Sequence, residues 1–331
     1  MTKYLITGGM GFIGSNFIRY MLQKHPDARI INLDKLTYAG NPENLRDIAR
    51  DKRYRNRYHF IKGDICNRKV VDKAMKDCDL VVHFAAESHV DRSIIDAGTF
   101  IQTDVFGTYV LLEAARRYKV SRFVQISTDE VYGHILRGSF KETDALNPRN
   151  PYSASKAAAD RLAHSFFTTY GLPIVITRSS NNFGPYQYPE KLIPLFVTNL
   201  IVGKKVPLYG KGKNIRDWIY VEDNCEAIDL VMRKGKLGEA YNIGAGNELP
   251  NIKITKTILE IMGKDKSWIK YVKDRPGHDL RYSLDSRKVR RLGWRPRTRF
   301  KEALEGTVRW YIDNPDWWEA VKVGTIQEIF S

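Results

Sequence analysis

Short apolar runs alternate with longer segments of helical periodicity along the first half of the chain. The runs predicted to be β-strands are Tyr4–Thr7, Ile30–Leu33, His59–Ile61, Leu80–His83, Phe123–Ile126 and Ile174–Thr177. Strands separated by helices pair in parallel through right-handed crossovers. The pattern therefore predicts an α/β fold, a doubly wound, Rossmann-like parallel sheet with helices on both faces.

The pattern changes after about Gly184, where closely spaced prolines and glycines interrupt short segments. Apolar and helical periodicity typical of a sheet and its helices returns at Trp218–Val221, Glu222–Lys234 and Ala240–Ile243. We therefore expect a larger domain formed by residues 1–185 and about 217–246. A smaller α/β lobe would be formed by about 186–216 together with 247–331, and we expect it to bind the substrate.

Composition and charge exclude several classes of protein. With 331 residues of which 43% are hydrophobic, the chain can bury a large core. No apolar run approaches the roughly 20 residues of a membrane helix, and the start lacks the pattern of a secretory signal, so we expect a cytoplasmic protein without a membrane partner. The net charge is +16, but Lys and Arg are spread along the chain, which predicts a solvated basic surface and no specific nucleic-acid partner.

Cysteine and histidine spacing gives no sign of a disulfide framework or a metal site. Cys66, Cys78 and Cys225 are far apart, and no histidine has a partner at the spacing of known zinc motifs. We expect ordinary thiols and no metal.

A glycine motif follows the first predicted strand. Gly8, Gly11 and Gly14 precede or open a helix that we expect to begin near Phe12. Such glycines let the backbone approach a pyrophosphate, and a helix N-terminus supplies amide donors. Asp34 lies 20 residues after Gly14, at the end of the second strand, where a carboxylate can accept both ribose hydroxyls and would repel a 2'-phosphate. The sequence therefore favours NAD over NADP, and the larger domain is predicted to be the NAD-binding domain.

Tyr152 and Lys156 have the spacing that brings both side chains to one face of a helix. A neighbouring ammonium lowers the pKa of a phenol, which then acts as a base near neutral pH. By itself this spacing also fits an ordinary amphipathic helix. The glycine motif upstream, and Ser127–Thr128 at the end of the preceding strand, favour the catalytic interpretation.

These motifs together resemble those of the extended short-chain dehydrogenase/reductase family, whose members act mostly on nucleotide sugars. Within it, Ser127–Gly133, with the sequence STDEVYG, resembles the motif of the dTDP-glucose 4,6-dehydratases. Further similar segments are Leu33–Asn41, Ala85–Ser93, Asn181–Gln187, Pro189–Pro194, Asn214–Trp218 and Asp274–Asp279. The resemblance covers the chain from Tyr4 to about Trp318.

The resemblance implies which residues bind NAD and the nucleotide sugar. For NAD they are Gly8, Gly11, Phe12, Ile13, Gly14, Asp34, Lys35, Thr37, Asp64, Ile65, Ala85, Ala86, Ser88, Thr103, Tyr152, Lys156 and Asn182. For the substrate they are Ser88, Thr128, Asn181, Glu190, Lys191, Leu192, Arg216, Asn251, Arg275 and His278. His278 is equally consistent with a structural loop histidine. Leu280 stands where relatives more often carry arginine, so the phosphate contacts near it are expected to differ from those of the relatives.

The adjacent carboxyls of Asp129 and Glu130 are a feature that a plain dehydrogenase does not need. Once C4 of the sugar is oxidised, the C5 proton is acidic, so an ionised carboxylate can remove it while a protonated one assists loss of the C6 hydroxyl. The resemblance implies that Glu130 is the C5 base and Asp129 the C6 acid. It also implies that Thr128 hydrogen-bonds the C4 hydroxyl beside Tyr152, and Lys156 completes the catalytic set. Two neighbouring carboxyls in a dry pocket tend to separate their pKa values in this way.

The expected reaction is therefore dehydration of dTDP-glucose to dTDP-4-keto-6-deoxyglucose, with the hydride returning to C6. Deoxysugar supply, such as dTDP-rhamnose for polysaccharides, would be its setting. The alternatives are a UDP-glucose 4,6-dehydratase, a nucleotide-sugar 4-epimerase, and a binding protein without catalysis that uses the basic surface. The resemblance also implies a homodimer, formed through two long helices predicted at Ser93–Tyr118 and Pro151–Tyr170.

Overall fold

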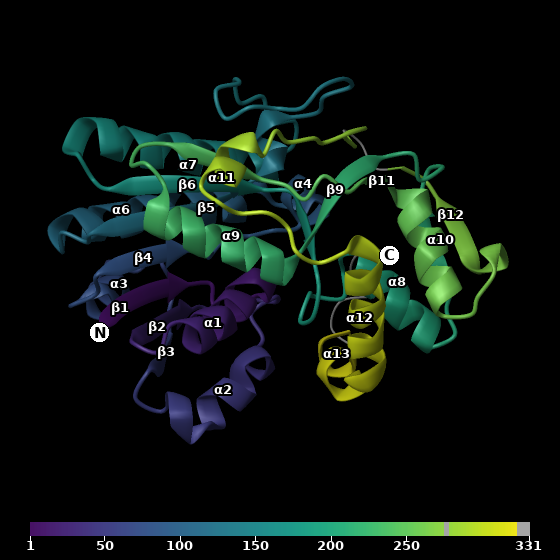
Figure 1. The fold of residues 1–331 in the computed structure, drawn as a ribbon, viewed down its shortest axis with the longest axis horizontal. Helices are drawn as coiled ribbons and strands as arrows, with labels where there is room; N and C mark the ends of the chain where they lie inside the picture. The colour runs from purple at the N-terminus through teal and green to yellow at the C-terminus, as the bar shows by residue number, and fades with distance from the viewer. Residues whose placement is uncertain (275–277, 323–331) are drawn as a thin grey trace.

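The computed structural model describes residues 1–274 and 278–322, and a seven-stranded parallel sheet forms its centre (Figure 1). In spatial order its strands are β10 (Ala240–Ile243), β6 (Ile174–Ser179), β5 (Arg122–Thr128), β4 (Leu80–His83), β1 (Thr2–Thr7), β2 (Ala28–Asp34) and β3 (Tyr58–Lys62). Every neighbouring pair is parallel. The expected α/β fold is confirmed, and each predicted strand falls within one of these strands.

Helices cover both faces of this sheet. One hydrophobic core joins β-strand residues to α1 (Phe12–Lys24) and α9 (Val221–Lys234), and a second joins the opposite face to α3 (Arg68–Met75), α6 (Thr108–Arg117) and α7 (Pro151–Tyr170). Figure 1 shows α1 and α9 on the near side of the sheet. The shorter elements between strands are η1 (Pro42–Leu45), α2 (Arg46–Arg50), η2 (Lys52–Tyr54), α4 (Val90–Ile95), α5 (Ala97–Phe100), the π-helix η3 (Ile101–Gly107), η4 (Asp129–Tyr132) and α11 (Arg287–Arg291).

The two helices predicted to be long differ in outcome. The prediction Pro151–Tyr170 is confirmed by α7, because Asn150 caps its N-terminus, Pro151 occupies the first turn, and Gly171 ends it with a φ of +67°. The prediction of one helix over residues 93–118 is wrong at its start. Asp96 has non-helical backbone angles, φ −137° and ψ 89°, that end α4, and its side chain accepts a hydrogen bond from Thr99 N, which caps a new helix at residue 97. The helical periodicity continues across Asp96 and so hides this break. Asp favours a cap over a helix interior, which is why the helix restarts there.

A second lobe has its own hydrophobic core, separate from the two that cover the main sheet. Its strands are β7 (Asn181–Phe183), β9 (Ile215–Tyr220) and β11 (Glu248–Pro250) in one sheet, with β8 (Val206–Tyr209) and β12 (Ile269–Val272) in another. Its helices are α8 (Leu192–Ile201), α10 (Asn251–Ile261), η5 (Lys266–Trp268), α12 (Phe300–Asp313) and α13 (Pro315–Lys322). The chain enters this lobe after β6 and returns to the main sheet for α9 and β10. Residues 218–220, expected in the larger domain, instead lie in β9 of this lobe. The predicted boundaries between the domains stay predictions.

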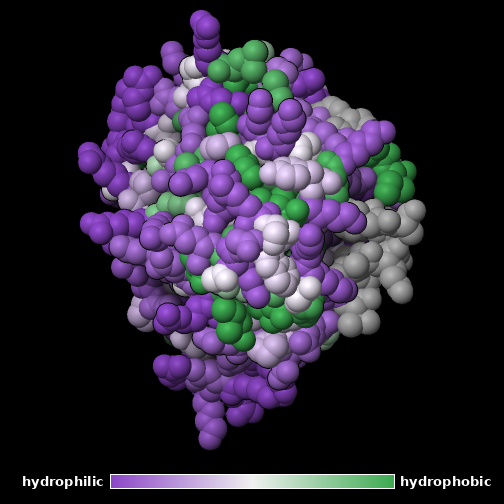
Figure 2. Space-filling view, turned by 90° about the vertical axis from the view of Figure 1, so that its right-hand side faces the viewer, coloured by the Kyte–Doolittle hydropathy of each residue, from purple (hydrophilic) through white to green (hydrophobic). Residues whose placement is uncertain are grey.

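One face of the molecule is mainly hydrophilic. Figure 2 shows the face on the side of α8, α10 and β12, with hydrophobic residues gathered in small separate groups. Within residues 1–274 and 278–322, no helix combines the length and the apolar character needed to cross a membrane.

Candidate active site

A cavity opens where the main sheet presents the carboxyl ends of β1, β2, β4 and β5. The connection after β1 leads to β2 on one side of it, whereas β4 lies on the other side, and ligands of doubly wound sheets bind at such a switch point. Every residue predicted to bind NAD lines this cavity, from Gly8 to Asn182. The structure therefore brings the predicted residues together, and their individual roles stay predictions.

The glycine motif is shaped by close backbone approach. Gly8 has a φ of +71°, and a Cβ atom there would lie 2.5 Å from Ala85 N. A Cβ on Gly14 would lie 2.3 Å from Gly8 O. Gly11 caps α1 without a side-chain hydrogen bond, and the first turn of α1 contains no acidic residue. The amide groups of this turn are therefore free of side-chain caps, which suits the binding of a pyrophosphate.

Asp34 is held in place at the end of β2. Its two carboxylate oxygens accept hydrogen bonds from Met10 N at 2.9 Å and Leu36 N at 2.8 Å. Burial raises the pKa of Asp34, and these two backbone donors offset part of that effect. Each oxygen retains a lone pair for a further donor, so the carboxyl is oriented for the ribose role that its position predicts.

Several buried polar atoms around this cavity have no hydrogen-bond partner among the described residues. They are Ser127 Oγ, Asp129 Oδ2, Asn181 Oδ1, Asn182 Oδ1 and Gln187 Oε1. Buried polar groups are nearly always paired, so these atoms indicate a polar ligand. Together with the close glycine turn and the uncapped helix, they fit NAD.

The predicted acid pair forms the short helix η4 directly after β5. Thr128 Oγ1 accepts a hydrogen bond from Glu130 N at 3.3 Å and donates one to Asp129 Oδ1 at 3.2 Å. The Asp129 side chain is only 3% exposed, and burial, with the neighbouring Glu130 carboxylate, raises the pKa of Asp129 well above its usual value. The raised pKa favours the protonated carboxyl that a general acid requires.

Tyr152 and Lys156 both line the cavity, but the lowered pKa expected for Tyr152 is not found. The pKa of Tyr152 is raised well above its usual value, first by burial and then by the carboxylates of Glu130, Asp104 and Asp129. The Lys156 ammonium instead donates to Ile126 O at 2.8 Å.

A second cavity adjoins the first and extends into the second lobe. Glu130, Asn181, Glu190 and Lys191 line both. Among the residues predicted to bind substrate, Ser88 and Thr128 line the first cavity, whereas Leu192, Arg216, Asn251 and His278 line the second. Arg275 lies outside the described residues. The predicted substrate residues that can be seen therefore form one continuous path away from the acid pair.

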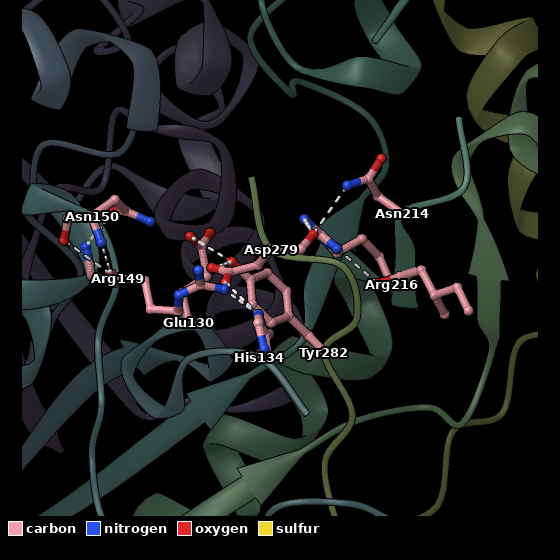
Figure 3. A network of polar contacts seen from close by, with 10 residues as sticks. Glu130, His134, Arg149, Asn150, Asn214, Arg216, Asp279 and Tyr282 are labelled. Carbon is pink, nitrogen blue, oxygen red and sulfur yellow. Dashed lines mark hydrogen bonds and ion pairs between the residues drawn. The ribbon is translucent and has the colours of Figure 1, made fainter. Parts of the chain in front are cut away.

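Asp279 is the centre of a polar network between the two cavities (Figure 3). Its carboxylate accepts hydrogen bonds from Arg149 Nη1 at 2.8 Å and from the Tyr282 hydroxyl at 2.6 Å. Its backbone carbonyl accepts from Asn214 Nδ2 at 3.1 Å and Arg216 Nη2 at 3.0 Å. The Tyr282 hydroxyl also lies 3.5 Å from Glu130 Oε2. This network links the predicted base to the second lobe.

Sequence reasoning missed three residues that the structure places at the site. Tyr282 lines the second cavity beneath the Arg216 guanidinium, which lies 4.1 Å from its ring centre. Arg149 reaches Asp279, and Lys322 lines the far part of the second cavity. No local motif marks these residues, because each reaches the site from a different segment. Leu280, by contrast, is 52% exposed and lines neither cavity.

Cys66, Cys78 and Cys225 are free. In the part of the chain that the structure describes, His, Cys, Asp and Glu side chains do not form a group of three or more that could hold a metal ion.

Comparison with known proteins places this site in a family. Residues 5–307 match the family model described as GDP-mannose 4,6 dehydratase. The chain belongs to this family. Within the GDP-mannose 4,6 dehydratase family, it is 50% identical over 325 residues to a dTDP-glucose 4,6-dehydratase of Streptomyces niveus, covering 97% of this chain and 96% of that protein.

Solved structures of family relatives have the same fold. The dTDP-glucose 4,6-dehydratase DesIV of Streptomyces venezuelae, with NAD and dTDP bound, is 50% identical, with a TM-score of 0.94 over 97% of this chain and 100% of that one. The UDP-glucose 4-epimerase of Thermus thermophilus, in complex with NAD, is 30% identical, with a TM-score of 0.85 over 95% of this chain and 100% of that one. Dehydratases and epimerases of this kind therefore share the fold of this chain.

Proposed function

We propose that this protein is a dTDP-glucose 4,6-dehydratase that uses NAD. The observation that carries the proposal is the acid pair at the junction of the two cavities. Asp129 is buried and its raised pKa favours the protonated form, whereas its neighbour Glu130 is partly exposed and lines both cavities. A pair of this kind supplies one acid and one base at adjacent carbons of a sugar. The similarity to dTDP-glucose 4,6-dehydratases along almost the whole chain supports the same activity.

The proposed roles follow the order of the reaction. NAD bound in the first cavity would accept the hydride of C4 and return it to C6. Tyr152 removes the proton of the C4 hydroxyl, which Thr128 orients, and Lys156 holds the cofactor ribose. Glu130 then removes the C5 proton while Asp129 protonates the departing C6 hydroxyl, and Glu130 returns its proton to C5. One water is lost in total, because the proton left on Tyr152 balances the one that Asp129 donates.

The second cavity is proposed to hold the nucleoside diphosphate. Arg216 presents a planar guanidinium held by Ile215 O at 2.8 Å and Asp279 O at 3.0 Å, and such a group binds a pyrophosphate with paired hydrogen bonds. Lys191, Glu190 and Asn251 line the same space. The identity of the base rests on the dTDP-glucose relatives, so UDP-glucose stays the nearest alternative.

Incubation of the purified protein with dTDP-glucose and NAD tests this function. We expect mass spectrometry to show a product lighter by one water, without net formation of reduced cofactor. Competition between dTDP-glucose and UDP-glucose in one reaction ranks the two bases. A product of unchanged mass and galactose configuration would instead establish a 4-epimerase.

We also propose that the protein is a cytoplasmic homodimer. Apolar side chains of the region from α4 to η3 are exposed in the single chain, with exposed fractions of 82% for Ile95 and 59% for Ile101. Burying such side chains against a second copy is favourable, and α6 and α7 pack beside this region. Sedimentation should give the mass of two chains, and Ile95→Glu should give one, whereas Ile312→Glu on exposed α12 should not. Fractionation of cells tests the location.

A further inference from the structure

A buried chain of polar contacts joins the helix that carries Tyr152 and Lys156 to the turn that carries the acid pair. Asp160, one turn after Lys156 on α7, accepts a hydrogen bond from Arg178 Nε at 2.9 Å. Arg178 Nη1 donates to the Tyr132 hydroxyl at 2.6 Å. Tyr132 is the last residue of η4, and its hydroxyl donates to Asn242 Oδ1 at 2.9 Å. The Tyr132 phenol therefore contacts β6 through Arg178 and β10 through Asn242, and Arg178 continues the chain of contacts to Asp160 on α7.

The contacts lie in the protein interior, away from solvent. Arg178 and Tyr132 are each 1% exposed, and Asp160 is fully buried. Arg178 pairs with Ser127 across β5 and β6, one residue before Thr128. Its guanidinium also lies 4.9 Å from the centre of the Tyr132 ring. Buried ion pairs contribute little net stability, so geometry is the clearer gain from such an arrangement.

The ring of Tyr132 has a further contact. Its ring stacks on Phe140, with ring centres 4.9 Å apart and planes 12° from parallel. Phe140 O accepts a hydrogen bond from Asn242 Nδ2 at 2.9 Å. The phenol ring thus contacts both a cation and an aromatic ring, while its hydroxyl is satisfied as both donor and acceptor.

We propose that Arg178 and Tyr132 are positioning residues that fix the acid pair relative to Tyr152. The inference rests on the proposed dehydration. Oxidation at C4 depends on α7, which carries Tyr152, whereas elimination of water depends on η4, which carries Asp129 and Glu130. Tyr132 anchors the C-terminal end of η4, so loosening this anchor displaces the two carboxyls while leaving Tyr152 and Thr128 in place. Elimination should then be slowed more than oxidation.

Tyr132→Phe tests the proposal with the smallest change, because the ring and its stacking remain. Tyr241→Phe is the matched control, since its buried hydroxyl accepts a hydrogen bond from Lys236 N at 2.8 Å, on the same strand as Asn242 but away from the site. Hydrogen exchange of the segment 127–134 gives a readout that needs no substrate. We expect faster exchange there in Tyr132→Phe and unchanged exchange in Tyr241→Phe.

Quenched single turnovers with dTDP-glucose give the second readout. We expect elimination to be slower by about tenfold to a hundredfold in Tyr132→Phe, because misplaced catalytic groups lose rates of this size. The 4-keto sugar that retains its C6 hydroxyl should accumulate in that variant and in Arg178→Lys. Equal slowing of oxidation and elimination, or unchanged exchange of residues 127–134, would overturn the positioning role. If the unaltered protein removes no water, the proposed function fails, and the exchange result still decides whether Tyr132 anchors η4.

Discussion

The two cavities of this protein are built in different ways. The first is formed by the ends of adjacent parallel strands and by backbone that approaches closely, as at Gly8 and Ala85. The second is formed by side chains from distant segments, and Asp279 joins two of them, Arg216 and Tyr282. Changes in backbone shape should therefore disable the first cavity, whereas changes in side-chain chemistry should disable the second. The acid pair lies where they meet.

The largest effect is expected at that junction. Glu130→Gln keeps the shape of the side chain but removes the base, so kcat should fall by about 10² to 10⁴. Solvent deuterium should no longer enter C5, as NMR of recovered sugar would show. NAD binding should be unchanged, and Glu302→Gln on exposed α12 should retain full activity. Substantial exchange at C5 in Glu130→Gln would assign the base to another residue.

A second prediction concerns the pKa of Asp104, a residue buried near the first cavity. It accepts hydrogen bonds from Glu87 N at 2.9 Å and Ser155 Oγ at 2.6 Å, and burial raises its pKa from 3.8 to about 6. The folded state thus binds this proton more tightly than the unfolded chain. The resulting stabilisation is fully present below the unfolded pKa and is lost as pH rises through about 6.

Asp104→Asn removes this titration. Between about pH 7 and pH 4, the free energy of unfolding of the unaltered protein should rise relative to that of the variant, by up to about 3 kcal/mol. Urea unfolding of both proteins at each pH measures the difference. A difference that does not change with pH would show that Asp104 has an ordinary pKa.

Gly8→Ala breaks the first cavity through its backbone. The added Cβ would lie 2.5 Å from Ala85 N, at a φ of +71°, so the turn must shift. We expect NAD affinity, measured by calorimetry, to fall by at least about tenfold, since the left-handed conformation alone costs about 1–2 kcal/mol. Gly171→Ala has nearly the same φ, +67°, with open space around it. It should lower stability similarly and leave NAD binding intact.

Arg216→Lys breaks the second cavity through side-chain chemistry. The lysine keeps the charge but loses the planar pair of donors, so KM for dTDP-glucose should rise by about tenfold with little change in kcat. Steady-state kinetics measure both constants. Arg309→Lys, on the exposed side of α12, should change neither. A fall in kcat without a rise in KM would place Arg216 in the chemical steps instead.

The same contrast explains how much could be predicted from the sequence. The first cavity follows from short-range patterns, because Gly8 directly follows β1, Gly14 lies in the first turn of α1, and Asp34 is the last residue of β2. Most of the predicted substrate residues also reach the site. Tyr282 and Arg149 carry no local pattern, since their roles depend on Asp279 in another segment. The raised pKa of Tyr152 depends on burial and on acidic side chains from two other segments, η4 and η3, and could not be predicted from its spacing to Lys156.

The central claim is that this site joins oxidation at C4 to loss of water between C5 and C6. Substrate carrying deuterium at C4 tests it most directly. We predict that the recovered sugar has lost one water and carries the deuterium at C6. Deuterium that remains at C4 of a sugar of unchanged composition would contradict the account and establish epimerisation.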